Sequence, residues 1–534
     1  MIIRSNCVDV TEKVNKALLS GETNIEFEKG EYHFYPEKAP ERESYISNHD
    51  NDGCKKVGVQ IENKSCVMIN GGGSRFVFHG IMLPFGIERC RDISLCNFSI
   101  DFPISTYIHS TILDADENSC TVKLWDNTPY RMNGDTPLFL IDGGYEFEYG
   151  HAMEFNPELE CVEYGTNDRD YFKESKAEEI EKGILKIRQK FNVIPKKGNY
   201  MFFSVGKRFA PAIFINFCDG VKIENVTVHH ALGMGLLAQL SKNIQISRMT
   251  VSPSSGRFVS TFADAAHFVE CMGSITINQC CFEKQMDDAL NCHGIYAQIE
   301  KADKNRAQLR LKHRQALGLN IFSAGDRVEY INPENLLSYG SNTVKSASMK
   351  SNEIIEIEFE NNIEAINGHY IENISHTPNL TVKNSYFGKN RARGLLITTR
   401  GKVIAENNVF EKIGAAIRIS GDANFWYESG CVKDVTVKNN TFIDCNANAR
   451  WGNSVIDIAP QVLKPAGPVH RNIRVEGNKF KTFDIPLLWA NCAENLFFTN
   501  NKIEKTNTFP PKGIIKEMMT LQNCIETTVE NNQL

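Results

Sequence analysis

The sequence has no long apolar run and no excess of basic residues, and each absence excludes a class of protein. No stretch of about 18 consecutive apolar residues occurs, so no transmembrane helix is expected. The formal net charge of the 534 residues is -6, whereas a protein that binds nucleic acid through phosphate contacts carries a basic patch or stripe. We therefore expect neither a membrane partner nor a nucleic-acid partner.

The chain also lacks Cys-x-x-Cys pairs, although it contains 16 cysteines. Without such pairs a structural zinc site is not expected. Several cysteines lie in alternating apolar segments, where a free thiol behaves as a small buried hydrophobe, and unpaired thiols in this number are typical of a reducing compartment. The N-terminal residues show no basic-then-apolar signal pattern. We therefore expect a cytoplasmic protein, or a secreted one if a signal was removed before this numbering begins.

What is present is a repeat in the C-terminal part of the chain: an asparagine, any residue, then a large apolar residue. The interval between copies runs from 23 residues, Asn478 to Asn501, to 38 residues, Asn440 to Asn478. Short alternating strands precede several copies, and an interval near the lower value with no helical periodicity is typical of one coil of a right-handed parallel β-helix. Asn in such a turn tolerates a left-handed backbone, and the apolar residue would stack on its equivalent in the next coil. The copies are Asn408-Val409-Phe410, Asn440-Thr441-Phe442, Asn478-Lys479-Phe480, Asn501-Lys502-Ile503 and Asn532-Gln533-Leu534.

The two ends of the predicted solenoid and its interruptions define its organisation. Val10, Val14, Ala17 and Leu18 fall on one helical face before Gly21, which predicts a short N-terminal helix that caps the first coil. Two stretches with alternating strands but no coil pattern predict inserted antiparallel β-barrel-like modules. We therefore divide the chain into a cap with the first coils (1–103), a first module (104–207), coils 208–295, a second module (296–370) and C-terminal coils (371–534).

The densest group of chemical residues lies between the two modules. Asp264 and Asp288 are 24 residues apart, about one coil, and so are His267 and Asn291. Equivalent positions on neighbouring coils lie about 4.8 Å apart, so Asp264, Asp287 and Asp288 should meet on one sheet face or in its adjoining turn. Carboxylates crowded in this way repel, so one should hold its proton while another stays ionised.

That division of charge suits glycosidic cleavage, which needs one carboxylic acid and one carboxylate. The spacing alone leaves inverting and retaining stereochemistry open. Each Asp could instead be an ordinary turn residue in a solvated acidic corner, and three Asp with a His could also bind Ca²⁺ or a transition metal. His267 and His293 are not at helical ligand spacing and no His-x-His occurs, so we expect no metal and no cofactor.

Five segments carry a resemblance to a known family. They resemble glycoside hydrolase family 110, which comprises exo-acting α-1,3-galactosidases that include blood-group-B-cleaving enzymes. The resemblance spans most of the chain and is strongest from about residue 210 to 450. The segments are Gly233-Met234-Gly235-Leu236-Leu237-Ala238-Gln239, Ala263-Asp264-Ala265-Ala266-His267-Phe268, the run from Asp287 to Gly294, the run from Arg393 to Arg400, and the run from Gly421 to Gly430.

The resemblance implies a right-handed parallel β-helix with inserted β-barrel modules, and an inverting, metal-independent hydrolysis of terminal α-1,3-linked galactose from a glycan. Asp264 stands where the family's proposed general acid stands, and Asp287 and Asp288 stand where its water-activating carboxylates stand. The motif does not decide which of the pair is the base. The family's best-known members are exported, whereas this chain shows no signal.

Further residues are candidates for binding the sugar. A galactose offers an apolar face to an aromatic ring and hydroxyls to charged or amide groups. Each candidate has an ordinary structural alternative, such as a buried loop anchor or an ion pair with a neighbouring acid. The oligomeric state stays open, and long sheet faces are compatible with a homo-oligomer. The substrate-binding candidates are His267, Asn291, His293, Arg257, Arg393, Arg400, Trp426 and Glu428.

Two other enzymatic activities and one non-catalytic function remain as alternatives. A polygalacturonase-like hydrolase also uses one Asp and an Asp-Asp pair, but its Gly-His-Gly is only partly echoed by Cys292-His293-Gly294, and its uronate-binding Arg-Ile-Lys is not apparent. A polysaccharide lyase would use Ca²⁺ with an Arg or Lys base. A non-catalytic β-helical glycan-binding protein would need aromatic grooves but no matched carboxylates.

Overall fold

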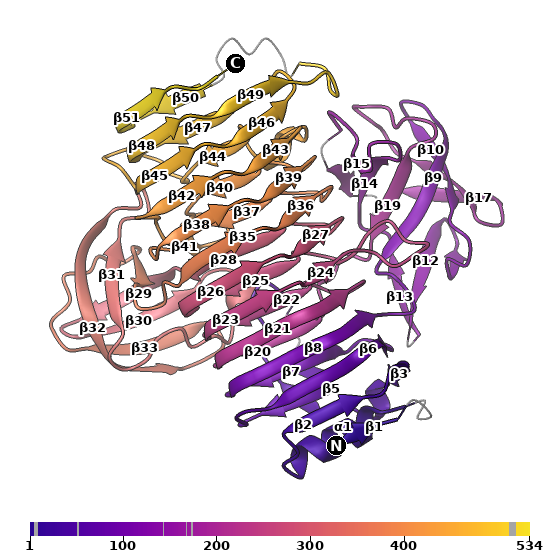
Figure 1. Cartoon of the computed structure of the whole chain (residues 1–534), viewed down its shortest axis with the longest axis horizontal. Helices are drawn as coiled ribbons and strands as arrows, with labels where there is room; N and C mark the ends of the chain where they lie inside the picture. The colour runs from indigo at the N-terminus through magenta and orange to yellow at the C-terminus, as the bar shows by residue number, and fades with distance from the viewer. Residues whose placement is uncertain are drawn as a thin grey trace.

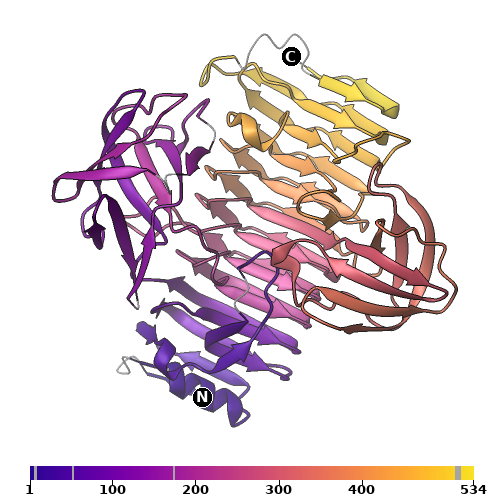
Figure 2. The ribbon, with the colours of Figure 1, turned by 180° about the vertical axis from the view of Figure 1, so that it is seen from behind.

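The chain forms a stack of β coils with two modules projecting from opposite sides. A computed structural model describes residues 1–4, 9–50, 53–142, 144–166, 168–171, 175–511 and 519–533. The coils follow one another from the N-terminus to the C-terminus, as Figure 1 and the reverse view in Figure 2 show. Strands of successive coils pair in parallel in three sheets, so the fold is the parallel β-helix that the repeat predicts.

The first two sheets share three long strands, β6 (Met68–Phe78), β8 (Arg91–Asp101) and β21 (Asp219–Val228), which run from one sheet into the other. The first sheet continues through β1 (Ile2–Ile3), β2 (Asn24–Phe27), β23 (Lys242–Ser247), β26 (Met272–Asn278), β35 (Asn379–Lys383), β38 (Val403–Glu406), β42 (Val435–Lys438), β45 (His470–Glu476), β48 (Ala493–Thr499) and β51 (Ile525–Glu530). The second contains β3 (Glu31–Phe34), β24 (Thr250–Val251), β27 (Cys281–Glu283), β36 (Tyr386–Gly388), β39 (Val409–Glu411), β43 (Thr441–Ile443), β46 (Lys479–Thr482) and β49 (Lys502–Lys505).

The third sheet carries the chemistry described below. It begins with β4 (Glu41–Glu43), which is antiparallel to the next strand, and is otherwise parallel apart from the short β41 (Glu428–Ser429) paired to one side of it. Its strands are β5 (Cys54–Glu62), β7 (Leu83–Glu88), β20 (Ile213–Asn216), β22 (Leu236–Gln239), β25 (Ala266–Val269), β28 (Leu290–Ile295), β37 (Leu395–Ile397), β40 (Ile417–Ile419), β44 (Ile456–Ile458), β47 (Leu488–Asn491) and β50 (Met519–Gln522).

The predicted repeat is a buried asparagine ladder beside a stack of phenylalanine rings. The backbone N–H of Asn408 donates to Oδ1 of Asn440 at 2.9 Å, and Asn440 does the same to Asn478. The rings of Phe410 and Phe442 stack with centroids 5.2 Å apart. One detail of the prediction is wrong: the left-handed residue is the one before each ladder asparagine, such as Asn407 at φ 56°, because the ladder residue itself must aim its amide along the solenoid axis.

The N-terminal helix α1 (Thr11–Leu19) caps the first coil as predicted. Its buried face includes Val14 and Leu18. Asn15 fixes it to β5, donating to the carbonyl of Gly58 at 2.7 Å and accepting from the N–H of Gln60 at 3.0 Å. The helix therefore satisfies backbone groups at the end of the solenoid as well as covering its apolar end.

The first module contains an antiparallel sheet and a smaller sheet that share one core, including Val122, Phe139 and Leu185. Among the described residues the larger sheet is open rather than closed into a barrel. The larger sheet consists of β9 (Tyr107–Ala115), β10 (Ser119–Leu124), β14 (His151–Asn156), β15 (Cys161–Val162), β16 (Arg169–Tyr171), β17 (Lys176–Glu181), β18 (Ile184–Arg188) and β19 (Tyr200–Ser204), and the smaller of β11 (Tyr130–Asn133), β12 (Thr136–Ile141) and β13 (Tyr145–Glu148).

The second module is a closed antiparallel barrel with its own core, which includes Leu309, Val328 and Ile357. Both modules leave the coil register intact, because β8 pairs with β21 and β26 pairs with β35 across them. The barrel consists of β29 (Ala297–Asp303), β30 (Arg306–Leu311), β33 (Ile354–Phe359), β32 (Ser338–Met349), β31 (Arg327–Ile331) and β34 (Tyr370–Asn373). Among the described residues, 3₁₀ turns lie at Pro36–Lys38 before β4, at Arg314–Ala316 in the second module, and at Ala449–Trp451 in the C-terminal coils.

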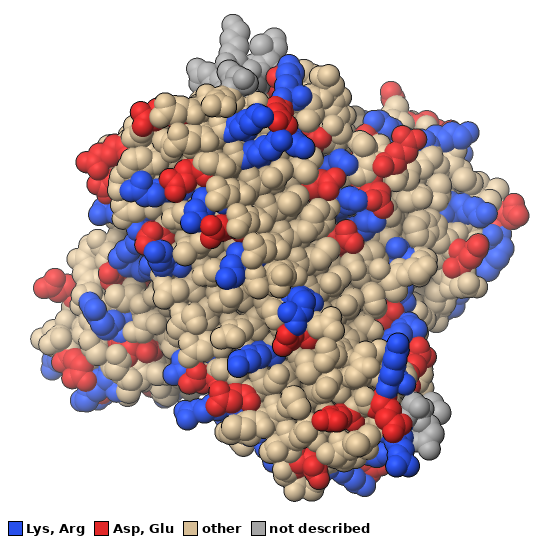
Figure 3. All heavy atoms as spheres, in the orientation of Figure 1, with Lys and Arg blue, Asp and Glu red and all other residues tan. Residues whose placement is uncertain are grey.

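The distribution of surface charge and the state of the cysteines are consistent with the small net charge and the lack of Cys-x-x-Cys pairs in the sequence. Figure 3 shows basic and acidic side chains interspersed over one face of the molecule. In the described part of the chain, no helix is long and apolar enough to cross a membrane. The cysteines that the structure describes are free thiols.

Candidate active site

A cavity of about 630 Å³ opens beside the third sheet, between the two modules. Its floor comes from the coils, and its walls come from both modules and from a segment that precedes β5. Because four separate parts of the chain enclose it, the cavity is a bounded recess rather than an open groove along the solenoid. The polar lining includes Asp264, Asp287, Asp288, Asn291, Arg393, Arg418, Asp422 and Glu428 from the coils, His151 and Arg208 at the first module, His313, Arg314 and Gln315 from the second module, and Asn48 and Asp50.

The three predicted carboxylates meet in the turns that lead into the third sheet. Asp264 precedes β25, and Asp287 and Asp288 precede β28 one coil later. The turns are themselves in register, because the N–H of Ala265 donates to the carbonyl of Asp288 at 3.0 Å. A Cβ on Gly235 in the preceding coil would lie 2.5 Å from the carbonyl oxygen of Ala265, so this close stacking of turns requires glycine there.

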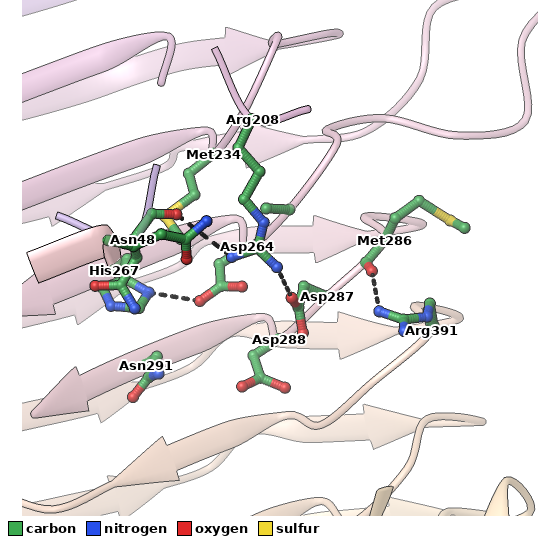
Figure 4. Close-up of polar contacts among 12 residues, drawn as sticks. Asn48, Arg208, Met234, Asp264, His267, Met286, Asp287, Asp288, Asn291 and Arg391 are labelled. Atoms are coloured by element: carbon green, nitrogen blue, oxygen red, sulfur yellow. Dashed lines mark hydrogen bonds and ion pairs between the residues drawn. The ribbon is translucent and has the colours of Figure 1, made fainter. Parts of the chain in front are cut away.

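Two arginines hold the paired carboxylates. Nη2 of Arg208 lies 2.6 Å from Oδ2 of Asp287 (Figure 4). Nε of Arg393 lies 2.8 Å from Oδ1 of Asp288, and the backbone N–H of Arg393 donates to the same oxygen at 2.9 Å. Arg393, a predicted sugar-binding residue, precedes β37 on the following coil; it lines the cavity and pairs with Asp288. Each member of the Asp pair is therefore fixed by a separate cation.

Burial raises the pKa values of two of the carboxylates to different extents. Burial, followed by the nearby charge of Asp287, raises the pKa of Asp264 well above its ordinary value. Burial also raises the pKa of Asp288, to about 7, against the opposing influence of Arg393. Near neutral pH Asp264 is therefore protonated while Asp288 can ionise, which is the split between acid and base that glycosidic cleavage requires.

His267 and Asn291 pair in register on β25 and β28, as the 24-residue interval predicts. Nδ1 of His267 lies 2.6 Å from Oδ2 of Asp264, and its Nε2 lies 2.8 Å from Nε2 of His293. Burial lowers the pKa of His267 well below its ordinary value, so this imidazole is neutral. His293 does not line the cavity and contacts His267 behind it.

Glu428 reaches the same floor from a loop. Strand β41 pairs with the end of β28, with Ile295 opposite Glu428. Nδ2 of Asn291 lies 3.4 Å from Oε1 of Glu428, and Oδ1 of Asn291 has no hydrogen-bond partner although it is buried. These two side chains therefore offer a donor and acceptors to a sugar hydroxyl in the cavity.

The loop before β41 presents two aromatic rings at the mouth of the cavity. The carboxylate of Asp422 accepts hydrogen bonds from the backbone N–H groups of Asn424, Phe425 and Trp426. The ring of Trp426 lies 4.7 Å from that of His313 in the second module. Phe425 is 66% exposed and Trp426 39% exposed. A loop that is internally pinned yet displays exposed rings is suited to covering a sugar face.

The structure corrects the prediction for two arginines. Arg257 lies in an ion pair of 2.8 Å with buried Asp101 and also donates to the carbonyl of Pro103, so it anchors the start of the first module. Arg400 pairs with Glu372 and with Glu329 in the barrel. Neither arginine lines the cavity. Arg400 instead joins the barrel to the coils, whereas Arg257 pairs with a buried acid of the coil strand β8 just before the first module.

Several cavity residues escaped the sequence prediction. Arg208 follows the first module, and Asp168 within that module pairs with Arg391 from the coils. Arg391 in turn lies over the ring of Trp451, 4.5 Å from its centroid. Arg418 lies on β40 and pairs with buried Asp457 at 2.6 Å. Arg418 stands at a coil-repeat position and Arg391 lies in a coil turn, so a regular spacing could have identified both. Arg208 and Asp168 come from segments with no period.

The acidic cluster has the spacing of a cation site, since one oxygen from each of the three Asp side chains lies within 4.8 Å of the others. Oxygen ligands of this kind suit Ca²⁺ or Mg²⁺. Here, however, guanidinium groups of Arg208 and Arg393 already pair with two of the three carboxylates. The protein's own cations thus balance the charge of the cluster.

Comparisons with known proteins place the chain in a family. Two domain families match its modules: GLAA-B beta-barrel domain I over residues 109–201 and GLAA-B beta-barrel domain II over residues 306–366. The chain is 33% identical to alpha-1,3-galactosidase A of Bacteroides fragilis strain YCH46, over 98% of this chain and 89% of that protein. It is 32% identical to alpha-1,3-galactosidase B of Bacteroides thetaiotaomicron, over 96% of this chain and 85% of that protein.

Among solved structures, an exopolygalacturonase from Thermotoga maritima aligns with a TM-score of 0.42 and 11% identity, over 100% of this chain and 91% of that chain. The assignment of the fold therefore rests on the strand pairings, and the assignment of the family rests on the sequence relatives. At these identities and coverages, the chain belongs to the α-1,3-galactosidase family, glycoside hydrolase family 110.

Proposed function

We propose that this protein is an exo-acting α-1,3-galactosidase that releases terminal α-1,3-linked galactose from glycans with inversion. The observation that carries the proposal is the buried trio of carboxylates with divided protonation, one protonated and one with a pKa of about 7. Its location in a bounded cavity and the family of the chain supply the substrate class.

In the first part of the reaction, Asp264 acts as the general acid. Its raised pKa keeps it protonated at neutral pH, and proton transfer to the glycosidic oxygen assists departure of the rest of the glycan. One oxygen of Asp264 faces His267, and Figure 4 shows the other turned toward Asp287. The scissile bond would lie beside that second oxygen.

Asp287 and Asp288 activate the water. The nearest oxygens of the trio lie within 4.8 Å, closer than the roughly 6.5–9.5 Å usual for inverting enzymes. The pair itself supports inversion: consecutive carboxylates, each oriented by its own arginine, can hold one water between two acceptors. A covalent nucleophile would act alone and would need no such partner.

The shape of the cavity supports attack at a chain end and a substrate larger than one sugar. Residues of both modules line the recess together with the coils, which favours binding of a chain end over an extended polymer. The volume of about 630 Å³ exceeds what one galactose ring occupies. We place the galactose against Asn291 and Glu428, and the following sugar against Trp426 and Phe425 at the rim.

We also propose that the protein acts in a reducing compartment. The described cysteines are free, and several of them are buried. Free thiols in this number persist where no oxidant pairs them. Fractionation of the native host cells with an antibody to the protein tests this location, and recovery of the protein in the extracellular fraction would contradict it.

The decisive assay is galactose release from two trisaccharides in parallel, one fucose-branched and of B type, the other a linear Galα1-3Gal-capped chain, with the anomer followed by NMR. Initial β-galactose is the expected product, and the ratio of the two rates measures branch preference. Initial α-galactose would contradict inversion. Turnover of a polyuronate with no galactose release would indicate the polygalacturonase-like activity instead.

A further inference from the structure

Behind the cavity, a chain of hydrogen bonds leads from the general acid to a backbone carbonyl. Oδ2 of Asp264 lies 2.6 Å from Nδ1 of His267, Nε2 of His267 lies 2.8 Å from Nε2 of His293, and Nδ1 of His293 lies 2.7 Å from the carbonyl oxygen of Gly294. Both imidazoles are almost fully buried. We infer that His267 and His293 are positioning residues that supply a proton to one oxygen of Asp264 as the other oxygen gives its proton to the leaving group. This inference rests on the proposed function.

The carbonyl at the end of the chain sets its direction. The oxygen of Gly294 can only accept, so Nδ1 of His293 carries a proton. If His293 is neutral, its Nε2 accepts, and Nε2 of His267 must donate to it. Nδ1 of neutral His267 then accepts in turn, so Oδ2 of Asp264 carries the proton. In this state the proton of Asp264 points toward His267 and away from the substrate.

One additional proton reverses the bond between Asp264 and His267 and the bond between His267 and His293, while Nδ1 of His293 continues to donate to Gly294. A proton arriving from the cavity at Oδ1 of Asp264 allows the Oδ2 proton to move to Nδ1 of His267. The proton on Nε2 of His267 then moves to Nε2 of His293, which becomes an imidazolium. Oε1 of Glu428 lies 3.6 Å from that nitrogen and offsets the positive charge. The acid now carries its proton on the oxygen that faces the cavity.

The catalytic step returns the chain to its first state. As Oδ1 of Asp264 gives its proton to the glycosidic oxygen and the bond to the anomeric carbon breaks, Nδ1 of His267 gives a proton to Oδ2. His293 passes one to His267, and all three groups end neutral. Asp264 therefore never becomes a bare carboxylate beside Asp287 and Asp288, where like charges would oppose its ionisation.

The surroundings support such a charge at His293 and contain the groups on which a pH profile would depend. Acidic side chains, one arginine and one further histidine surround the two imidazoles. They are Asp264, Asp287, Glu428, Arg208, His49 and Glu270.

The test uses two variants and two leaving groups. His293→Met removes the donor while keeping a similar volume, and His293→Gln retains an amide donor toward His267. A Galα1-3Gal-capped trisaccharide needs a strong acid at its leaving oxygen, whereas an aryl α-galactoside with an acidic phenol does not. We expect His293→Met to lower kcat at least tenfold on the trisaccharide and less than threefold on the aryl substrate, with KM within twofold. We expect His293→Gln, whose amide donates a hydrogen bond but cannot take up a proton, to lose as much activity as His293→Met, and the alkaline limb of the kcat profile to move down in pH in both.

Equal losses on the two substrates would show a merely structural role, and wild-type-like activity of His293→Gln would show that a hydrogen-bond donor suffices. Either result would overturn the inference. Asp264→Asn is assayed beside them. If it abolishes trisaccharide turnover while both His293 variants behave like the wild type, the proton chain is refuted and the proposed function stands. If Asp264→Asn retains full activity, the proposed function itself fails.

Discussion

His267 and Asn291 lie side by side in register on β25 and β28, although 24 residues separate them in the chain. The same one-coil step brings Asp264 next to Asp288. Residues that are one coil apart in the sequence are thus neighbours in the site, because each coil places its polar residues beside those of the next coil. Consequently, single substitutions in this turn should alter chemistry while the coils around them keep their packing.

The first prediction concerns the acid. Asp264→Asn should lower kcat on a Galα1-3Gal-capped glycan by roughly 10²–10⁴-fold, the usual contribution of a general acid, with little change in KM. Initial rates over a range of substrate concentrations measure it. Asp219→Asn, the same change on the first sheet, is the matched control. Wild-type-like turnover in Asp264→Asn would contradict the assignment.

The second prediction concerns the pH profile. Activity requires Asp264 protonated and its partner carboxylate ionised, so the rate should fall on both sides of an optimum. The pKa of Asp288 is about 7, so the acid limb should lie near pH 7 and the alkaline limb above it, where Asp264 deprotonates. Measurements of kcat from pH 4 to 10 test this. A rate that is flat from pH 5 to 7 would show that ionisation of Asp288 is not required.

The third prediction concerns stability. The ordinary pKa of Asp264 is 3.8 and its folded value is well above that, so above about pH 4 the unfolded state releases a proton that the folded state retains. The stabilising contribution of protonated Asp264 to the free energy of unfolding is therefore present at low pH and is lost as pH rises toward the folded pKa. Asn at this position cannot ionise and can still donate to His267.

Asp264→Asn should accordingly unfold at the same temperature as the wild type near pH 4 and at a higher temperature near pH 8. The difference in the free energy of unfolding should be at least about 1 kcal/mol, since one pKa unit corresponds to about 1.4 kcal/mol. Thermal melts at both pH values provide the comparison. A difference that does not change with pH would rule out the raised pKa.

The fourth prediction concerns the rim. Phe425→Ala should raise KM roughly two- to tenfold for a trisaccharide, because an exposed ring contact contributes about 0.5–1.5 kcal/mol. It should leave KM for methyl α-galactoside nearly unchanged, since a methyl group ends before the rim. Tyr145→Ala, which removes an exposed ring from the first module, is the control. An equal effect on both substrates would place Phe425 against the galactose itself.

The fifth prediction concerns metals. Arg208 and Arg393 already pair with two of the three carboxylates, so excess EDTA should leave kcat and the melting temperature unchanged. Assays before and after dialysis against EDTA, followed by addition of Ca²⁺ or Zn²⁺, measure this. A loss of activity that Ca²⁺ restores would turn the acidic cluster into a metal site.

The parts of the structure that follow the coil period could be predicted from the sequence. The asparagine ladder, the stacked phenylalanines and the meeting of Asp264 with Asp288 all follow the succession of coils, which is visible in a sequence as recurring motifs and spacings. Arg393 was within reach for the same reason, because it opens the next coil.

The remainder of the site has no period. Arg208 and His313 reach the cavity from segments inside or beside the modules, and Asp168 of the first module holds the cavity residue Arg391; the folding of a module sets their direction. Arg257 and Arg400 illustrate the reverse error: they stand beside site segments in the sequence, but a buried acid of β8 holds Arg257 elsewhere and a buried acid of the barrel holds Arg400 elsewhere. Neighbourhood in sequence indicates neighbourhood in space only within a coil.

The uninterrupted pairing of β8 with β21 and of β26 with β35 separates two kinds of evolutionary change. A module can lengthen, shorten or be exchanged at its turn while acid and base keep their places in the scaffold. Descendants of one ancestor could thereby diversify in the glycans they accept while inheriting the same bond-breaking machinery. In protein engineering, the modules are therefore the segments to exchange, and the coils are the segments to keep unchanged.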